Sequence, residues 1–182
     1  MSAALARAST TDAADDPNPA WLAQILAARR AGHGCLPWRL GLEPRDHAAL
    51  LAQLGVDGGA APGEDLRQEL LELRRDEWDE LRELLLAGRR GAAVEEVWLA
   101  AIVAAACLGG NHLWRDLGLA SRQQLRELLL HNFPALAQRN VADMRWKKFF
   151  YKQLCERDGG HLCRAPSCAQ CPTYHDCFGA EL

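Results

Sequence analysis

The residues best suited to chemistry lie near the end of the chain, where four of its seven cysteines fall between positions 163 and 177. Cys163, Cys168, Cys171 and Cys177 follow the spacing C-x4-C-x2-C-x5-C. Thiolates are soft, strongly donating ligands, and four of them on one loop can converge on a metal centre. Glycine and proline residues interrupt the segment, so we expect an irregular loop rather than a helix or strand. The spacing therefore predicts a metal–thiolate site.

Two kinds of metal site accept four thiolates. A structural zinc site usually pairs two C-x2-C units, because one small tetrahedral ion needs its ligands close together. This loop has one such pair, Cys168 and Cys171, with wider gaps on both sides. A cluster of several metals tolerates uneven gaps, and the step from Cys171 to Pro172 is similar to the Cys-Pro step of ferredoxin loops. The spacing favours an iron–sulfur cluster, and zinc is the main alternative.

The composition is that of an ordinary globular chain, with 182 residues, 49% hydrophobic residues and a net charge of −3. This charge gives no indication of nucleic acid or an anionic membrane as a partner. No secretory signal is present at the N-terminus, and the longest apolar run, 97–108, is too short to span a bilayer. We therefore expect a cytoplasmic protein whose cysteines stay reduced and available for metal binding.

The elements that must position the cysteines are predicted to be helices, because no stretch shows the period-two alternation of a strand. We expect an all-α helical bundle that carries the irregular cysteine loop. Three regions follow from this: a disordered N-terminal segment (1–18), a helical domain (19–157) and a C-terminal cluster-binding loop (158–182). Within the helical domain, helices are expected from Pro19, over 44–54, over 64–87, over 92–108, after a capping box at Ser121 and over 143–156.

Two of these helices have the clearest patterns. In the region 64–87, leucines recur at helical spacing and are expected to face the core; they are Leu66, Leu70, Leu73, Leu81, Leu84 and Leu85. The region 92–108 is hydrophobic on nearly every side, which predicts a helix at the centre of the bundle.

The helix over 143–156 has an apolar side with Trp146, Phe149, Phe150 and Leu154, and it also carries all three lysines of the chain. One hypothesis is that its basic residues attract an anion or an acidic partner beside the metal site; these residues are Arg145, Lys147, Lys148 and Lys152. The other is an ordinary amphipathic helix with a solvated face. The aromatic residues share one side suited to core burial, which argues against nucleic-acid binding by stacking.

The second half of the chain resembles the NifQ family, the molybdenum-handling accessory proteins of nitrogen fixation. Besides the cysteine spacing, the resemblance rests on Asn111-His-Leu-Trp-Arg-Asp-Leu-Gly118, on Asn132-Phe-Pro134 and on the closing Cys177-Phe-Gly179. It also includes Asn140-Val-Ala-Asp-Met-Arg-Trp-Lys-Lys-Phe-Phe-Tyr-Lys-Gln-Leu-Cys155. It is therefore continuous from about Asn111 to the end, whereas the earlier helices match only in general character.

This resemblance implies a non-enzymatic carrier that holds molybdenum in a mixed Mo–Fe–S cluster, or in a cluster of the [4Fe-4S] type. The ligands would be Cys163, Cys168, Cys171 and Cys177. Molybdate would be the metal source, and the acceptors would be proteins of nitrogenase cofactor assembly, namely the cofactor scaffold and the nitrogenase iron protein. The molybdenum would serve biosynthesis of the iron–molybdenum cofactor.

The sequence gives weaker indications of function for the histidines and for the other cysteines. His161 and His175 lie within two residues of a predicted ligand, so either could bind molybdenum or donate a hydrogen bond to sulfur. A solvent-exposed loop histidine is the simpler interpretation of both. Cys35 and Cys107 are interpreted as structural, and Cys155 as a buried helix cysteine or a spare thiolate during cluster loading.

Two other functions compete with the carrier. One is a zinc-stabilised helical interaction module, which would contain zinc and no sulfide. The other is an iron–sulfur protein that processes nucleic acid, because a similar loop with a longer first gap resembles that of endonuclease III-type glycosylases. The shorter gap and the lack of a glycine-rich helix-hairpin-helix loop make this second alternative a minor one.

Overall fold

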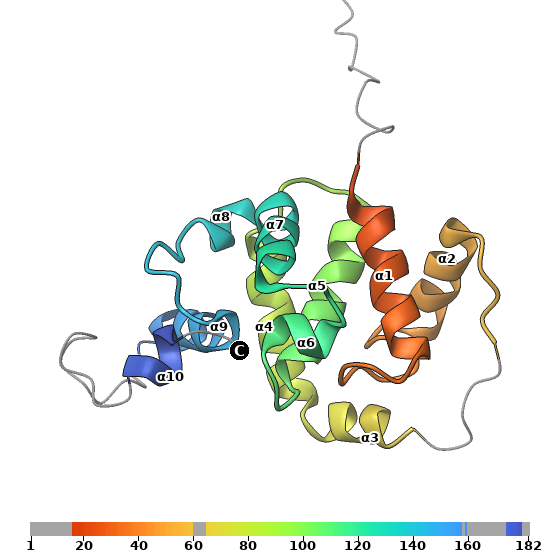
Figure 1. The fold of residues 1–182 in the computed structure, drawn as a ribbon, viewed down its shortest axis with the longest axis horizontal. Coiled ribbons are helices and arrows are strands. Elements are labelled where there is room, and N and C mark those ends of the chain that lie inside the picture. Colours follow the sequence, from red (N-terminus) through yellow and green to blue (C-terminus); the bar gives the residue numbers. More distant parts are fainter. Residues whose placement is uncertain (1–15, 60–64, 158, 160–173, 180–182) are drawn as a thin grey trace, which may run out of the picture.

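The computed structural model describes residues 16–59, 65–157, 159 and 174–179 (Figure 1). All regular structure in these ranges is helical and none is strand, which confirms the expected all-α class. The helices are α1 (Asn18–Arg30), α2 (Pro44–Leu54), α3 (Leu66–Leu73), α4 (Arg75–Ala87), α5 (Val94–Cys107), α6 (Leu113–Leu117), α7 (Arg122–Asn132), α8 (Pro134–Ala137), α9 (Trp146–Arg157) and α10 (Tyr174–Phe178).

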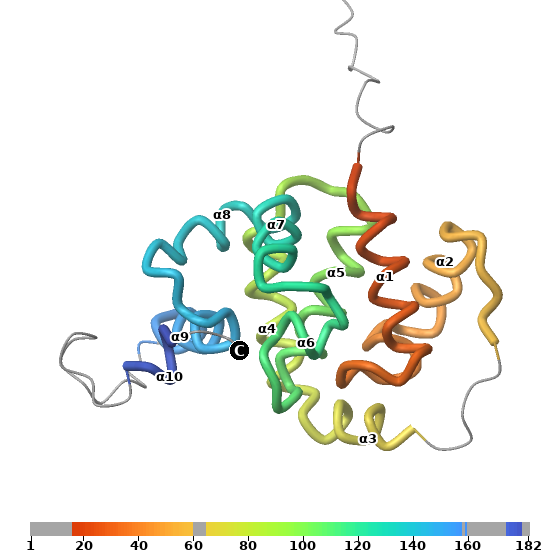
Figure 2. Tube along the Cα trace, viewed as in Figure 1, coloured from red at the N-terminus to blue at the C-terminus, as the bar shows by residue number. Residues whose placement is uncertain are grey.

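Helix α5 forms the centre of the bundle, as its apolar sequence predicts. Nearly every residue from Trp98 to Cys107 is buried. Many of these residues are alanines, whose small side chains let neighbouring helices approach closely. Helices α4 and α6 make the most extensive contacts with α5, and α1 also packs against it. Helices α9 and α10 lie together at one end of the molecule, far from α2 (Figure 2).

Helices α1 and α2 confirm the sequence prediction closely. Proline lies in the first turn of each, where its missing N–H costs nothing. The apolar face of α1 is buried as expected, with Leu22 and Ile25 fully inaccessible. Helix α2 ends at Gly55, whose φ of 64° is the left-handed conformation that glycine adopts readily.

The predicted helix over 64–87 is wrong in one respect, because it breaks at Arg74 into α3 and α4. Arg74 has non-helical dihedrals (φ −118°, ψ 31°), although no glycine or proline stands nearby. Its guanidinium donates to both carboxylate oxygens of Glu77, at 2.7 and 2.8 Å, and to the carbonyl of Leu108 at 2.8 Å. We attribute the break to these three bonds. The two bonds to Glu77 lie in the first turn of α4, and the third joins Arg74 to the C-terminal end of α5.

The break changes which leucines are buried. In α4, Leu81, Leu84 and Leu85 face the core as predicted. In α3 only Leu71 is buried, whereas Leu66, Leu70 and Leu73 are exposed, contrary to the prediction. In one straight helix, the buried side of α4 would have extended along the predicted leucines of α3. Because the chain turns at Arg74, the side of α3 that bears Leu71 faces the core instead.

The capping box that opens α7 is present in modified form. The hydroxyl of Ser121 accepts a hydrogen bond from the backbone N–H of Gln124 at 3.1 Å, as predicted. The side-chain oxygen of Gln124 accepts from the N–H of Ala120 at 2.8 Å, one residue before the expected partner.

No helix within the described ranges is long and apolar enough to cross a bilayer. The predicted disordered segment falls largely on residues 1–15, which lie outside the described part of the chain. The structure describes residues 159 and 174–179 of the predicted cysteine loop.

Candidate functional site: the docked C-terminal helix

Two of the predicted site residues, His175 and Cys177, lie on α10. The sequence analysis expected an irregular loop here. That expectation is wrong for Tyr174–Phe178, which form a helix of five residues. The rings of Tyr174 and Phe178 stack one turn apart with centroids 4.5 Å from each other, which favours the helical turn. Cys163, Cys168, Cys171 and His161 lie outside the described residues, so their role as ligands stays a prediction.

Helix α10 is docked against the start of α9 by one arginine. The guanidinium of Arg145 donates to the carbonyl of Gly179 at 3.3 Å and to that of Asp176 at 3.2 Å. Its backbone N–H donates to the carbonyl of Cys177 at 2.7 Å. Carbonyls at a helix C-terminus lack partners within the helix and carry partial negative charge, so a cation is well placed there. Arg145 thereby fixes the backbone of a predicted cluster ligand to the helical bundle.

The side chains of α10 reinforce this attachment. Cys177 and Phe178 are partly buried and pack against the hydrophobic core. Gly179 closes the helix, with its N–H bonded to the carbonyl of His175 at 2.9 Å. A Cβ at position 179 would lie 2.5 Å from that carbonyl oxygen and 3.1 Å from the Arg145 guanidinium. Glycine is therefore required where α10 meets Arg145.

The segment before α9 is shaped by a buried asparagine. The side chain of Asn140 donates to the carbonyl of Met144 at 2.8 Å and accepts from the N–H of Met144 at 2.9 Å. Arg122, on α7, donates to the carbonyls of Asp143 and Met144. These bonds hold the loop that leads into Arg145, so the anchor of α10 is itself fixed to the bundle.

Lys147 does not belong to an open basic surface. Its ammonium donates to Asp116 Oδ2 at 2.5 Å and to the carbonyl of Gly109 at 2.7 Å. The side chain of Asp116 is fully buried, and that of Lys147 is 17% exposed. Asp116 also accepts from the backbone N–H of Asn111 at 3.0 Å. A buried carboxylate needs such partners, because an isolated charge is strongly disfavoured away from water.

The other basic residues of this helix are also engaged in part. Arg145 binds α10, and Lys152 lies 3.6 Å from Glu156, one turn further along α9. Lys148 is exposed. The hypothesis of a four-residue anion-attracting surface is therefore wrong for Lys147, which is largely buried and paired with Asp116. For Arg145, Lys148 and Lys152 it stays a prediction. Sequence reasoning missed the bonds that Arg145 and Lys147 make within the fold, because their partners lie at least 31 positions away in the chain.

The cysteines outside the C-terminal motif have the structural character that the sequence suggested. The thiol of Cys35 donates to the carbonyl of Ala106 at 3.7 Å. Burial, together with the nearby Asp116 carboxylate, raises the pKa of Cys35 to about 12. Burial raises the pKa of Cys107 to about 12 as well. Both are protonated at neutral pH and poorly suited to bind metal. Cys155 is half-buried on α9 rather than fully buried.

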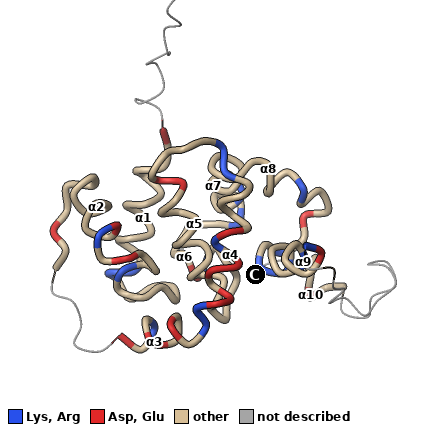
Figure 3. Tube along the Cα trace, turned by 180° about the vertical axis from the view of Figure 1, so that it is seen from behind, with Lys and Arg blue, Asp and Glu red and all other residues tan. Residues whose placement is uncertain are grey.

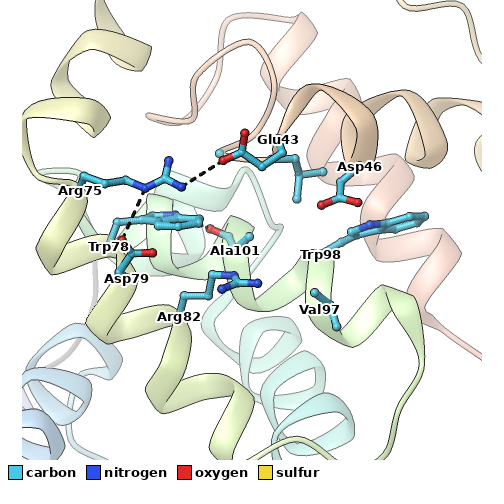
Figure 4. Close-up of a pocket in the computed structure, with 11 residues that line it drawn as sticks. Glu43, Asp46, Arg75, Trp78, Asp79, Arg82, Val97, Trp98 and Ala101 are labelled. Atoms are coloured by element: carbon cyan, nitrogen blue, oxygen red, sulfur yellow. Dashed lines mark hydrogen bonds and ion pairs between the residues drawn. The ribbon is translucent and has the colours of Figure 1, made fainter.

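A small pocket of about 150 Å³ lies between α2, α4 and α5 (Figure 4). Arg75 lies over the ring of Trp78 at 4.3 Å, and it is 3.0 Å from Glu43 and 3.6 Å from Asp79. The charge of Arg75 is thus compensated by Glu43 and Asp79, so these charged residues of the pocket need no ligand to account for them. Among the residues that the structure describes, no three His, Cys, Asp or Glu side chains converge to hold a metal ion.

Comparison with known proteins identifies the family of this chain. The sequence model of the NifQ family matches residues 21–179, which run from within α1 through the cysteine motif to the end of α10. The protein NifQ of Azotobacter vinelandii is 58% identical over 193 aligned positions, covering 100% of this chain and 99% of the relative. Protein NifQ of Klebsiella pneumoniae is 41% identical (87% of this chain, 96% of the relative), and that of Rhodobacter capsulatus 42% (88% and 87%). No solved structure matches. The chain belongs to the NifQ family.

Proposed function

We propose that this chain is a metallocluster carrier that binds molybdenum in a Mo–Fe–S cluster and donates it for biosynthesis of the nitrogenase iron–molybdenum cofactor. The observation that supports this most is the motif C-x4-C-x2-C-x5-C at the end of a full-length NifQ match. The cluster is cargo: the chain binds it, protects it and releases it, and we assign no catalytic residue.

The residues proposed to hold the cargo are Cys163, Cys168, Cys171 and Cys177, and the donor set suits it. Thiolates bind iron and molybdenum well, and uneven gaps fit a cluster larger than one ion. Cys177 lies half-buried on a docked helix, so one ligand would have a fixed backbone without being enclosed by the core. A donor needs this balance, because fully enclosed ligands would hinder release. His175 lies on α10 with Cys177, and His161 and His175 are proposed to bind molybdenum or a cluster sulfur.

The proposed exchange takes place in the cytoplasm, with molybdate as the metal source. The proposed acceptors are the cofactor scaffold protein and the nitrogenase iron protein. Neither nucleic acid nor a membrane enters this function.

Transfer of labelled molybdenum tests the proposal directly. The full chain is loaded anaerobically with radioactive molybdenum, mixed with the cofactor-assembly proteins and separated from them again. We expect label to move to the acceptors from the unaltered chain and from Cys35→Ser, a matched control at a thiol already bonded within the fold. Cys171→Ser is expected to lose the cluster before mixing. Unchanged metal content in Cys171→Ser would refute that ligand assignment, and retention of all label by the loaded chain would refute the donor role.

A further inference from the structure

Helix α3 displays an unusual stripe of exposed leucines. Leu66, Leu70 and Leu73 are 68%, 60% and 81% exposed, although α3 has only eight residues. Single exposed apolar residues are common on protein surfaces, but a contiguous group of large ones marks an interaction site. The break at Arg74 creates this stripe, because it turns these leucines away from the core.

The leucines share one narrow side of the helix. At about 100° per residue, Leu66, Leu70 and Leu73 fall within an arc of about 60°. Arg67 and Arg74 lie on one flank of this arc, about 80–100° around the helix axis from Leu66. This flank lies between the leucine stripe and the buried Leu71. Glu69 lies on the opposite flank. The stripe thus has a cationic border on the side that faces the body of the protein.

A groove of about 370 Å³ adjoins this cationic border. Its wall on α3 is formed by Arg67, Leu70, Leu71 and Arg74. The facing wall is largely apolar or small and includes Pro37, Ala105, Leu108 and Gly110. The groove therefore has room for apolar side chains next to the leucine stripe, and two arginines are among the residues that line it.

The charge on this border is only partly compensated. Arg74 is neutralised by Glu77. Arg67 donates to the carbonyl of Leu36 at 3.3 Å, and no ion pair of Arg67 occurs within the described residues. Burial, with Arg67 nearby, lowers the pKa of Arg29. Arg29 and Arg67 therefore lie close to each other, and Asp65, 4.0 Å from Arg29, compensates one of the two charges. An incoming carboxylate would relieve this excess of positive charge.

We infer that the leucine stripe of α3 and the adjoining groove form a docking surface for an acidic amphipathic segment of a partner protein. An apolar side chain of the partner would enter the groove over Leu70 and Leu71. A neighbouring Asp or Glu would pair with Arg67. The partner buries apolar surface in the centre, and the charge pair at the rim sets its orientation. The inference is independent of the cargo, because it uses no residue assigned to metal binding. Acidic and basic residues along α3 and α4 are visible in Figure 3.

Site-specific photo-crosslinking in nitrogen-fixing cells tests this surface. A benzoylphenylalanine replaces Leu73 in the full chain, and the crosslinked peptides are sequenced by mass spectrometry. The control carries the same residue at Val141, which is 90% exposed on the loop before α9. From Leu73 we expect one segment of another protein, rich in Asp or Glu and containing an apolar residue, and we expect it to be absent from Val141. Arg67→Glu and Leu70→Gln should each lower its yield about tenfold, equivalent to about 1.4 kcal/mol.

Several results would overturn the inference. Crosslinks to a second copy of this chain would identify a self-association surface instead. A basic partner segment, or a yield that does not change in Arg67→Glu, would refute the charge pairing. No yield above that of the Val141 control would refute the docking surface itself. Circular dichroism and metal content should be unchanged in both variants, because the altered side chains lie outside the core and outside the cysteine motif.

Discussion

At the scale of single residues, the fold depends on charges that the sequence places far apart. Asp116 is fully buried and Lys147 largely so, and they meet across 31 positions of chain at the junction of α6 and α9. Local patterns describe neighbours within a few residues, so they could not pair these two or predict that Arg145 caps α10. The sequence did predict the local hydrogen bond from Gln124 to Ser121, because both partners lie within one helical turn.

Removing the cation of this pair should be costly. Lys147→Met leaves the Asp116 carboxylate buried without its main partner, and we expect a loss of about 3–5 kcal/mol in the free energy of unfolding. Urea denaturation measures this value. The matched control is Lys148→Met, whose side chain is exposed on the same helix and whose effect should stay within about 0.5 kcal/mol. Equal effects at both positions would contradict the buried pair, and Asp116→Asn in the Lys147→Met background should recover part of the loss.

The thiol of Cys35 should be unreactive although it is only half-buried. A rise in its pKa from 9.0 to about 12 reduces the thiolate fraction at pH 8 on the order of 1,000-fold. Because the folded-state pKa is raised, alkylation should stay slow from pH 7 to 9 and increase about tenfold per pH unit without reaching a plateau. Iodoacetamide labelling of the native apo chain, read by mass spectrometry, checks this. Labelling as fast as that of glutathione would contradict the environment described for Cys35.

At the scale of elements, sequence patterns predicted helices well wherever the apolar residues kept one helical spacing along the whole element. The apolar run of α5, the proline-initiated α1 and the glycine-terminated α2 all form as expected. The break between α3 and α4 could not be predicted, because one of the three hydrogen bonds to which we attribute it joins Arg74 to Leu108, 34 positions away. Helix α10 was missed for a similar reason: a helix of five residues is not stable alone and here depends on Arg145.

Loss of the Arg145 side chain should therefore release α10 while the rest of the bundle stays folded. In Arg145→Met we expect the opening energy of α10 to fall by roughly 2 kcal/mol, which is about thirtyfold faster exchange of the Gly179 amide. Hydrogen exchange by NMR measures this directly. Lys152→Met is the control, since Lys152 interacts with Glu156 within α9 and not with α10. Unchanged exchange at Gly179 would show that Arg145 does not hold this helix.

At the scale of the whole molecule, the described part of the chain is a helical bundle with α9 and α10 at one end (Figure 1). The leucine stripe lies on α3. The fold class and the central position of α5 followed from composition and period. The candidate ligands were proposed from the cysteine spacing, because close cysteine clusters are rare without a metal or disulfide, and their role stays a prediction. The attachment of Cys177 to the bundle required tertiary structure, since it depends on contacts between α9 and α10.

We propose that this chain carries a molybdenum-containing iron–sulfur cluster on its four C-terminal cysteines. The most direct test is analysis of iron, molybdenum, zinc and acid-labile sulfide in full-length protein purified anaerobically from cells supplied with molybdate. We expect iron and sulfide together with molybdenum on the same chain, all of them lost in Cys171→Ser and retained in Cys35→Ser. Zinc without sulfide would contradict it and would identify a helical module stabilised by a structural metal.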